Sequence, residues 1–490
     1  MARWNQRFRA AIFLVVLLGI ACRVGLFLSR QSFWGDEAYL LLNLRHYSLW
    51  RILTGRLDYV SSTQAAPPLF LLILKYVMQY LGSSEYSMRL LPLVCSSLAL
   101  PLYAILALRL LPPAVAFWPV AFLAFTDVLV VQAATLKQYS GDALVVVLLL
   151  LIAFPRGFSS PSRRLLSVAL VASVTLWFSH PTIFLFAAVS LALLPHFIRG
   201  PVANRLRYCL LNLPVALSFF ALYFFSIRAQ RDPFLDAYWS ECFIDFAQPL
   251  RIPRFIVENT WELFTYPVRP LGGLLLIPAA FGIVSLHRSR KNELLTALLA
   301  PIVLVFLAGA THQYPYTAGR ITIFLIPCEF LLAAFGIPAM RRILPQPFHH
   351  APWILPAGIL ILMLSLLPSR SVFRDHSGHL RSAVEHLVAH RQPTEPIYIL
   401  GQEESAVFRC YHPVPDSLTY FDLPLSTYPT DDAFWLLFRA NRLRKLPKDA
   451  VSPLVQPHAT LDTSASLDPP SGGAALRFVK CSAPATRPAN

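Results

Sequence analysis

Long apolar stretches separated by short polar loops dominate the chain up to about residue 370. A hydrocarbon core of about 30 Å needs roughly 20 apolar residues in a helix, and several of these stretches lie near the short limit. The apolar windows fall at 11–28, 88–108, 113–126, 140–154, 165–179, 181–198, 208–227, 270–286, 294–310, 321–339 and 352–368. The pattern therefore predicts an all-α polytopic membrane bundle with about eleven spans.

One further stretch, APPLFLLILKYVMQYLG at residues 66–82, is apolar but shorter, and it contains Lys75. Counting it as a span would turn the later basic loops to the other side of the membrane. We therefore predict that 67–81 forms an amphipathic helix in the interface on the outer side. Residues 29–87 then form one long external loop.

Basic residues are concentrated in every second loop of the predicted bundle. They are Arg3, Arg7, Arg9, Arg109, Arg156, Arg163, Arg164, Arg199, Arg205, Arg207, Arg288, Arg290, Lys291, Arg341 and Arg342. Because cytoplasmic loops are enriched in Lys and Arg, we expect a cytoplasmic N-terminus. An odd number of spans then makes the C-terminus extracytoplasmic. We expect a multi-pass protein of the plasma membrane, which in a bacterium is the inner membrane.

The composition changes after residue 370, where His, Pro, Asp and Arg become frequent and no apolar run is long enough to span. Short strands are predicted at PIYILG (396–401), AFWLLFRA (433–440) and ALRFVK (475–480), and an amphipathic helix at 379–391. The sequence thus predicts a transmembrane domain at 1–370 and a small extracytoplasmic α/β domain at 371–490.

The overall composition agrees with a membrane protein. The chain is 56% hydrophobic and 14% charged, and its formal net charge is +16. In a chain of mean hydropathy +0.54, such an excess belongs to cytoplasmic loops and anionic headgroups rather than to nucleic acid. The seven cysteines lack the spacing of a zinc or redox site. We interpret the apolar N-terminal segment as a retained first helix, because no clear cleavage site follows it.

Two adjacent acids, Asp36 and Glu37 in FWGDEAYLLL, follow directly on the first predicted span. They could be ordinary interfacial acids, or they could stabilise the start of a helix through its dipole. A partly desolvated carboxylate at this depth could also act as a general base toward a substrate at the membrane surface.

Three other polar motifs are predicted on the same side of the membrane. TLKQYSGDAL contains Lys137 and Tyr139, WFSHP contains His180, and THQYPYTAGR contains His312 and Arg320. Each has a structural alternative, such as a snorkelling lysine, an interfacial arginine or a helix-capping histidine. Together, an acidic base with Lys and Arg nearby suits a reaction whose leaving group is a phosphate.

The ordered motifs GDEAY, APP, SEYSMRLLP, LKQYSGD, WFSHP and AGRITIFLIP resemble GT-C glycosyltransferases of the protein O-mannosyltransferase and lipid A aminoarabinose transferase type, a bacterial family 39-like group. The resemblance covers roughly residues 8–370, and the acidic pair is its most diagnostic element. It implies a large membrane bundle, two interfacial helices in the first external loop and a cavity facing the non-cytoplasmic side. It also implies a polyprenyl-phosphate sugar donor and inversion at the anomeric carbon.

By the same resemblance, Asp36 is the expected catalytic base and Glu37 the neighbour that orients or binds. Binding of the donor phosphate by Lys137, Arg320 and Tyr139 is our own inference, because these positions match the family only loosely. His180, His312 and Lys75 are the expected substrate-binding residues. The family often has Lys or His before the Pro-Pro pair, whereas Ala66 stands here. Lys75 is therefore a candidate substitute for that missing contact.

The sequence thus predicts a hexosyl or pentosyl transferase acting on a lipid, glycan or protein acceptor at the extracytoplasmic face. A polytopic transporter or flippase of lipid-linked or small polar cargo is the alternative from another class. A ligase or polymerase of lipid-linked glycans is a further alternative. No cofactor is required, although a divalent metal would be compatible with the chemistry. Cys410 and Cys481 either form a disulfide across the α/β domain or remain free thiols.

Overall fold

The computed structural model describes residues 2–59, 64–157, 160–343, 351–366, 380–390, 397–412, 420–421, 433–439 and 476–482. The chain forms two compact units. The first, here called the helical unit, comprises Met1–Ser29, Leu49–Arg56 and Ala65–Phe373. The second, the mixed unit, comprises Arg30–Ser48, Leu57–Gln64 and Arg374–Asn490. The predicted domain boundary at 370/371 lies outside the described residues.

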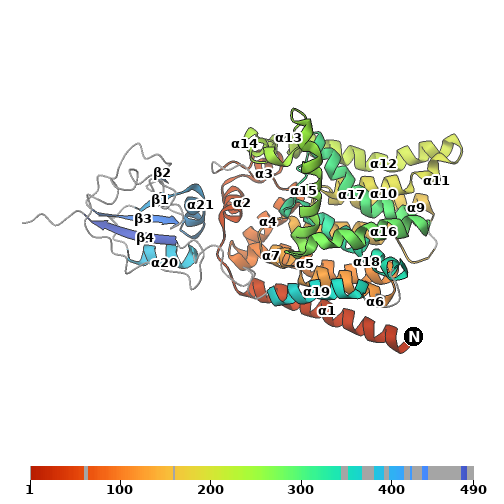
Figure 1. The fold of residues 1–490 in the computed structure, drawn as a ribbon. Coiled ribbons are helices and arrows are strands. Elements are labelled where there is room, and N and C mark those ends of the chain that lie inside the picture. The colour runs from red at the N-terminus through yellow and green to blue at the C-terminus, as the bar shows by residue number, and fades with distance from the viewer. Residues whose placement is uncertain are drawn as a thin grey trace, which may run out of the picture. The chain divides into compact units, whose positions relative to one another are not determined.

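Every apolar window of the sequence contains a helix of the helical unit, and most of these helices run in a similar direction (Figure 1). They are α1 (Ala2–Leu28), α5 (Glu85–Leu110), α6 (Pro113–Phe125), α8 (Tyr139–Ala153), α9 (Pro161–Thr175), α10 (Thr182–Leu193), α12 (Val202–Leu222), α16 (Leu276–Arg288), α17 (Asn292–Ala310), α18 (Ile326–Ile343) and α19 (Ala351–Leu366). Within the described residues, five helices are long and apolar enough to cross a membrane, or up to seven with two bent pairs. The predicted polytopic helical bundle is confirmed.

Shorter helices connect the bundle. They are α3 (Leu49–Thr54), α4 (Pro68–Leu81), α7 (Asp127–Ala133), α11 (Pro195–Ile198), η1 (Tyr223–Ile227), α13 (Arg228–Gln230), α14 (Pro233–Tyr238), η2 (Ser240–Cys242), η3 (Pro249–Arg251), α15 (Ile252–Thr265), η4 (Tyr266–Val268), η5 (Gly272–Leu275) and η6 (Arg320–Leu325). The helix predicted at 67–81 is α4. The predicted first external loop contains three helices, α2 (Gly35–His46), α3 and α4, where the resemblance implied two.

The window predicted at 113–126 is part of a broken element, because α6 and α7 meet at an angle of 51°. Arg23 of α1 is buried at this break, where its Nη1 and Nη2 atoms donate hydrogen bonds to the carbonyl oxygens of Ala124 and Leu123 at 2.7 and 2.9 Å. These carbonyls lie at the end of α6, where the helix leaves its last acceptors without partners. The guanidinium therefore stabilises the bend that turns the chain into α7.

Helices α16 and α18 approach each other with their backbones in contact. A Cβ atom added at Gly282 of α16 would overlap the carbonyl oxygen of Leu332, and one added at Gly336 of α18 would overlap that of Pro278. Small residues allow this close packing in membranes, where the hydrophobic effect does not drive helices together. The two glycines fix α16 and α18 as a pair.

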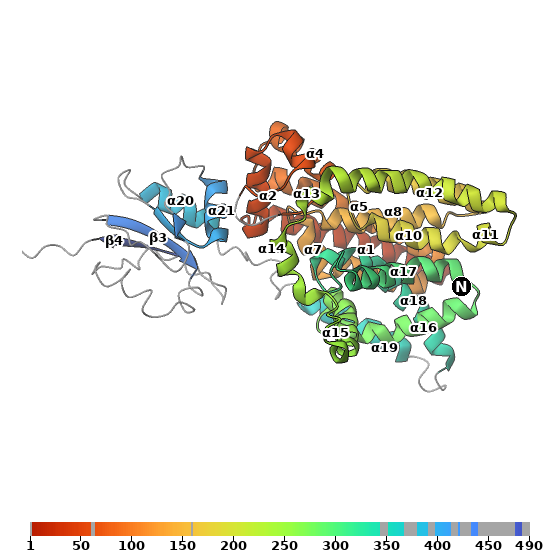
Figure 2. The same cartoon turned by 90° about the horizontal axis from the view of Figure 1, so that it is seen from above.

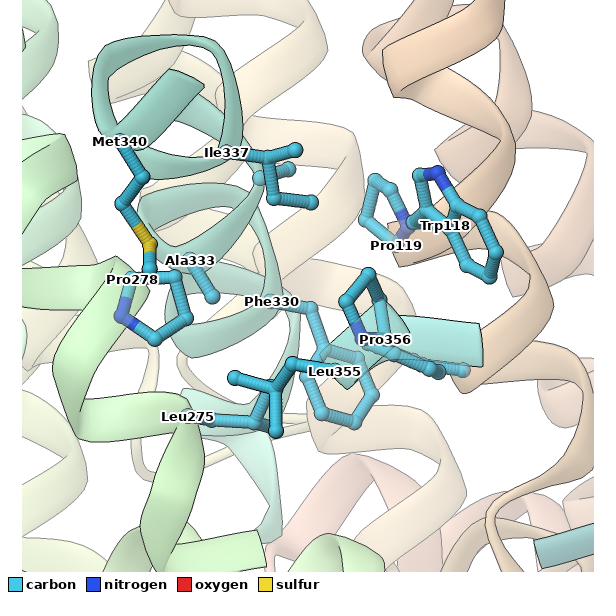
Figure 3. A pocket seen from close by; sticks show the side chains of 12 residues that line it. Trp118, Pro119, Leu275, Pro278, Phe330, Ala333, Ile337, Met340, Leu355 and Pro356 are labelled. Carbon is cyan, nitrogen blue, oxygen red and sulfur yellow. The ribbon is translucent and has the colours of Figure 1, made fainter. Parts of the chain in front are cut away.

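Helix α19 closes the bundle over α6, α16 and α18. Trp118 of α6 and Trp353 of α19 lie 6.3 Å apart between ring centroids. The residues between these helices, including Phe330 and Pro356, leave an apolar crevice of only about 10 Å³ (Figure 3). This volume corresponds to about one water molecule, so the crevice is a packing defect rather than a ligand site.

The mixed unit contains a four-stranded sheet in the order β2-β1-β3-β4. Its strands are β1 (Ile397–Leu400), β2 (Tyr420–Phe421), β3 (Ala433–Arg439) and β4 (Leu476–Ser482). β1 pairs in parallel with β2 and β3, whereas β3 and β4 are antiparallel. Helices α20 (Leu380–His390) and α21 (Gln402–Tyr411) pack on each other and on one face of the sheet (Figure 2). The predicted α/β domain, its three strands and its helix at 379–391 are confirmed.

Candidate active site

The acidic pair lies in the first turn of α2 (Gly35–His46), which belongs to the mixed unit. Asp36 is partly exposed, whereas Glu37 is fully buried. The Glu37 carboxylate accepts a hydrogen bond from the backbone N–H of Trp34 at 3.3 Å. Both acids are therefore placed where the helix dipole favours negative charge. Glu37 therefore has the helix-capping role that was the structural alternative. Asp36 is the more accessible of the two carboxylates.

The segment that carries the acidic pair is held by residues nearly 380 positions away in the sequence. The N–H of Phe33 donates a hydrogen bond of 2.7 Å to the Tyr411 hydroxyl, and the two rings stack at 5.9 Å. Arg45 donates to the carbonyl oxygen of Cys410 at 2.8 Å, which caps the end of α21. The Ser32 hydroxyl accepts a hydrogen bond from the N–H of Arg381 at the start of α20. The acidic helix is thus fixed on the α/β domain at both of its ends.

Gly35, next to the acidic pair, allows α21 to approach closely. A Cβ atom at this position would lie 2.8 Å from Cγ of Glu403. Cys410 is buried against α2, with its Sγ atom 3.7 Å from the carbonyl oxygen of Ala38. Its thiol is free, which is the second of the two predicted alternatives, and the side chain of Cys481 lies outside the described residues.

In the helical unit, the two motifs LKQYSGD and WFSHP lie against each other. A Cβ atom at Gly141 would meet the Phe178 ring at 2.6 Å, so any other residue at the start of α8 would force this ring to move. The Asp142 carboxyl faces Ser179 in the next motif. Lys137 and Tyr139 are both buried in the same region, which we call the site end, the end of the helical unit at which α8 begins.

Several buried polar atoms at the site end have no hydrogen-bond partner among the described residues. They are Oε1 of Gln138, Oδ1 of Asp142, Oγ of Ser179 and Nε2 of His180. Buried polar atoms are almost always satisfied in folded proteins, and each exception calls for an explanation. Burial lowers the pKa of the loop residue His180 to about 4, so its imidazole is neutral at physiological pH. A polar ligand would satisfy these atoms.

In the third motif, THQYPYTAGR, Tyr314 and His312 contact different parts of the helical unit. The Tyr314 hydroxyl donates to the carbonyl oxygen of Ile321 at 2.7 Å, and its pKa is raised well above the usual range by burial and by the charge of Asp142. His312 instead has a φ of 56° and stacks on Phe243 at 4.9 Å. Its imidazole thus contacts the 243–244 segment, whereas Tyr314 belongs to the site end.

Arg320 is accompanied by charged residues that the sequence analysis did not single out. It begins η6, which packs against α7 and α8, and α7 also packs against η4. The charges of Arg269, Asp127 and Arg320 all act on the hydroxyl of Tyr266 in η4. The Arg269 guanidinium lies over the Tyr266 ring, 4.8 Å from its centroid. Two arginines and one aspartate therefore converge at the site end.

Lys75 and Ala66 show how the departure from the family motif is accommodated. Ala66 is 1% exposed, and its N–H and carbonyl group bind the side chain of Gln230 at 3.0 and 3.1 Å. A longer side chain at this position would have no room. Phe70 of α4 packs edge-on against Phe178 at 6.1 Å, but Lys75 lies more than one turn further along α4 and is half-buried. The role of Lys75 as a substitute stays a prediction from the sequence.

The residues that the sequence analysis missed are Arg269, Asp127 and Tyr266. Arg269 occurs in TYPVRPLGG, before the window predicted as a simple span at 270–286. The chain bends there by 106° between two helical segments. A single arginine between apolar segments is also typical of an interfacial anchor, so the pattern alone did not separate the two roles. The adjacent Pro and Gly residues were the available signal for a bend.

The chemistry of the site end suits an anion. Lys and Arg provide a point charge and a planar fork for phosphate or carboxylate oxygens, and the unpartnered atoms can orient polar groups such as hydroxyls. Among the residues that the structure describes, no group of three or more His, Cys, Asp or Glu side chains could hold a metal ion. The absence of a metal requirement remains a prediction from the sequence.

No protein-family profile and no curated protein sequence matches the chain. Among solved structures, it is similar to ArnT from Cupriavidus metallidurans bound to undecaprenyl phosphate, with a TM-score of 0.50 and 12% identity over 98% of both chains. It is also similar to the apo state of the same protein, with a TM-score of 0.52 and 14% identity over 96% of this chain and 98% of the other. The chain therefore has the fold of ArnT, and the GT-C fold implied by the sequence resemblance is confirmed.

Proposed function

We propose that this protein is a membrane glycosyltransferase that moves a sugar from a polyprenyl-phosphate donor to an acceptor at the extracytoplasmic face, with inversion. The observation that carries the proposal is the site end, where unpartnered buried polar atoms lie in a region that also contains Lys137, Arg269 and Arg320. The ArnT structure of the same fold is bound to undecaprenyl phosphate, a phosphate-bearing lipid of the proposed donor class.

The proposed reaction uses two groups of residues with different tasks. Asp36 takes the proton of the acceptor hydroxyl or amine as its lone pair attacks the anomeric carbon. The bond from that carbon to the phosphate oxygen breaks, and the electron pair leaves with the lipid phosphate. Arg320, Arg269 and Lys137 stabilise the negative charge that develops on the phosphate. Glu37 holds the start of α2, so it orients Asp36 rather than exchanging protons.

The sugar-binding role is assigned to the unpartnered atoms near His180. The neutral imidazole of His180 and the hydroxyl of Ser179 can donate or accept hydrogen bonds. The Asp142 carboxyl adds an acceptor for sugar hydroxyl groups. The acceptor is a lipid, a glycan or a protein, and we propose that it approaches from the extracytoplasmic side of a bacterial inner membrane.

The proposal is tested with Asp36→Asn, because the amide keeps the shape of the side chain but cannot take a proton. Loss of a general base typically slows a reaction by about 10²–10⁴-fold. Mass spectrometry of envelope glycans and lipids, with and without the gene, identifies the product whose formation is then measured. Binding of undecaprenyl phosphate to the purified variant should remain unchanged, since Asp36 does not hold the phosphate.

Asp58→Asn provides a matched control. Asp58 is also a carboxylate of the mixed unit, and it accepts an exposed hydrogen bond from Tyr47 at 2.8 Å. Its amide variant should retain transfer. More than half of the wild-type rate in Asp36→Asn, or an equal loss in the control, would show that Asp36 is not the base.

A further inference from the structure

A cleft lined by arginines lies at the opposite end of the helical unit, where α8 ends. We call this the basic end. The cleft has a volume of about 480 Å³ and is lined by Arg109, Leu110, Phe154, Pro155, Arg156, Gly157, Arg164 and Glu293. It combines cationic groups with an apolar wall. Its position at the far end of α8 from Tyr139 makes it separate from the candidate active site.

Two of the arginines are held in place by the last carbonyl groups of α8. Arg109 donates to the carbonyl oxygen of Leu151 at 3.3 Å, and Arg164 donates to that of Ala153 at 2.7 Å. The Arg164 guanidinium also lies over the Phe154 ring at 5.4 Å. Cations near a helix C-terminus are favoured by its dipole. The guanidinium groups are therefore pre-organised, and Nε of Arg109 is buried without a hydrogen-bond partner among the described residues.

The acidic residue of the cleft is already engaged. The Glu293 carboxylate pairs with Arg164 at 2.8 Å through one oxygen and with His196 at 2.6 Å through the other. No ion pair is found for Arg109 or Arg156 within the part of the chain that the structure describes. The cleft therefore retains uncompensated positive charge after its internal pairing.

A second cleft continues on the other side of Glu293. It has a volume of about 430 Å³, and its basic lining residues are His196, Arg199 and Arg290. Arg290 has a φ of 55°, a left-handed conformation that costs a non-glycine residue free energy just after the end of α16.

The general enrichment of basic residues in cytoplasmic loops explains the presence of these arginines but not their arrangement in clefts. Arginine forks bind phosphate oxygens in pairs, and an apolar wall suits the glycerol and first methylene groups of a lipid. Basic pockets between membrane helices are known to bind anionic headgroups. We propose that the cleft containing Arg109 and Arg156 binds the phosphate of an anionic phospholipid from the adjacent leaflet. This site is independent of the proposed glycosyl transfer.

The test uses the full chain in detergent, with phosphatidylglycerol as the probe and native mass spectrometry as the readout of bound lipid. We expect selective retention of phosphatidylglycerol over phosphatidylcholine. Arg156→Gln should weaken retention by about tenfold, since the amide cannot make the charge-assisted contact of a guanidinium with a phosphate oxygen. Arg156 is exposed, and no hydrogen bond or ion pair of its side chain is found among the residues that the structure describes, so this variant should remain folded.

Arg288→Gln is the matched control, because Arg288 is an exposed arginine at the end of α16 that does not line either cleft. It should change retention by less than twofold. Equal losses in the two variants would mean that only diffuse charge attracts the lipid, and the proposal would be wrong. Equal retention of the two lipids would also overturn it. Displacement of phosphatidylglycerol by millimolar inorganic phosphate would assign the cleft to a soluble phosphate instead.

Discussion

Removing the hydroxyl of Tyr411 tests whether the α/β domain positions the acidic pair. In Tyr411→Phe, the ring can still stack on Phe33, but the Phe33 N–H loses its acceptor at 2.7 Å. A buried donor without a partner costs about 1–3 kcal/mol. Tyr411 is half-buried, so water can partly replace its hydroxyl as the acceptor of the Phe33 N–H. The lower end of this range, about 1 kcal/mol, is therefore the expected cost.

This cost should appear as local opening of the segment that precedes α2. A change of about 1 kcal/mol in local stability corresponds to about fivefold faster amide exchange. Hydrogen exchange resolved at Phe33 by mass spectrometry measures it directly. Transfer by the variant should also slow, with kcat reduced more than KM, because Asp36 would be held less firmly while the donor site is unchanged.

Tyr47→Phe is the control for the loss of a hydroxyl in the same unit. Its hydroxyl donates to Asp58 at 2.8 Å in an exposed position, where such a bond contributes little. Exchange at Phe33 should change by less than twofold in this variant. An unchanged exchange rate in Tyr411→Phe, or the same acceleration in both variants, would refute the positioning argument.

Two further predictions concern titratable groups. Burial raises the pKa of the Cys410 thiol to about 12. At pH 8 the thiolate fraction is then roughly 10⁻⁴, compared with about 0.2 for an ordinary thiol. Because maleimide reacts with the thiolate, it should label Cys410 only after denaturation. A Ser48→Cys variant, at an exposed position of the same unit, should label readily, and rapid labelling of native Cys410 would contradict the buried thiol. Because burial lowers the pKa of His180 to about 4, the imidazole is neutral at both pH 6 and pH 8, and His180→Gln should reduce transfer by the same factor at both. A reduction that differs by more than threefold between the two pH values would indicate a protonated histidine.

The helices of the bundle could be predicted because a hydrocarbon layer demands long apolar runs, and each of the windows contains a helix. The strands at 397–400, 433–439 and 476–482 were predicted for a similar reason, since short runs of β-branched and aromatic residues favour buried strands. These are local properties of the sequence. They do not depend on which segments meet in space.

The association of α2 with α21 could not be predicted, because it joins residues 378 positions apart through a backbone N–H and a hydroxyl. No pattern within a window of sequence encodes such a contact. His312 illustrates a different limit, since its left-handed backbone and its stacking on Phe243 direct the imidazole to another segment. The part it would play in substrate binding stays a prediction from the motif alone.

The glycine contact between α16 and α18 has a consequence for the two arginines of the site end. Arg269 precedes α16 across a short bend, and Arg320 begins the turn that leads into α18. Gly282 and Gly336 bring the two helix backbones into contact, and any larger residue at either position would push the helices apart. The spacing of the two segments that carry these arginines therefore depends on how α16 packs on α18. If these arginines hold the donor phosphate as proposed, substitutions at Gly282 or Gly336 would alter phosphate binding from a distance.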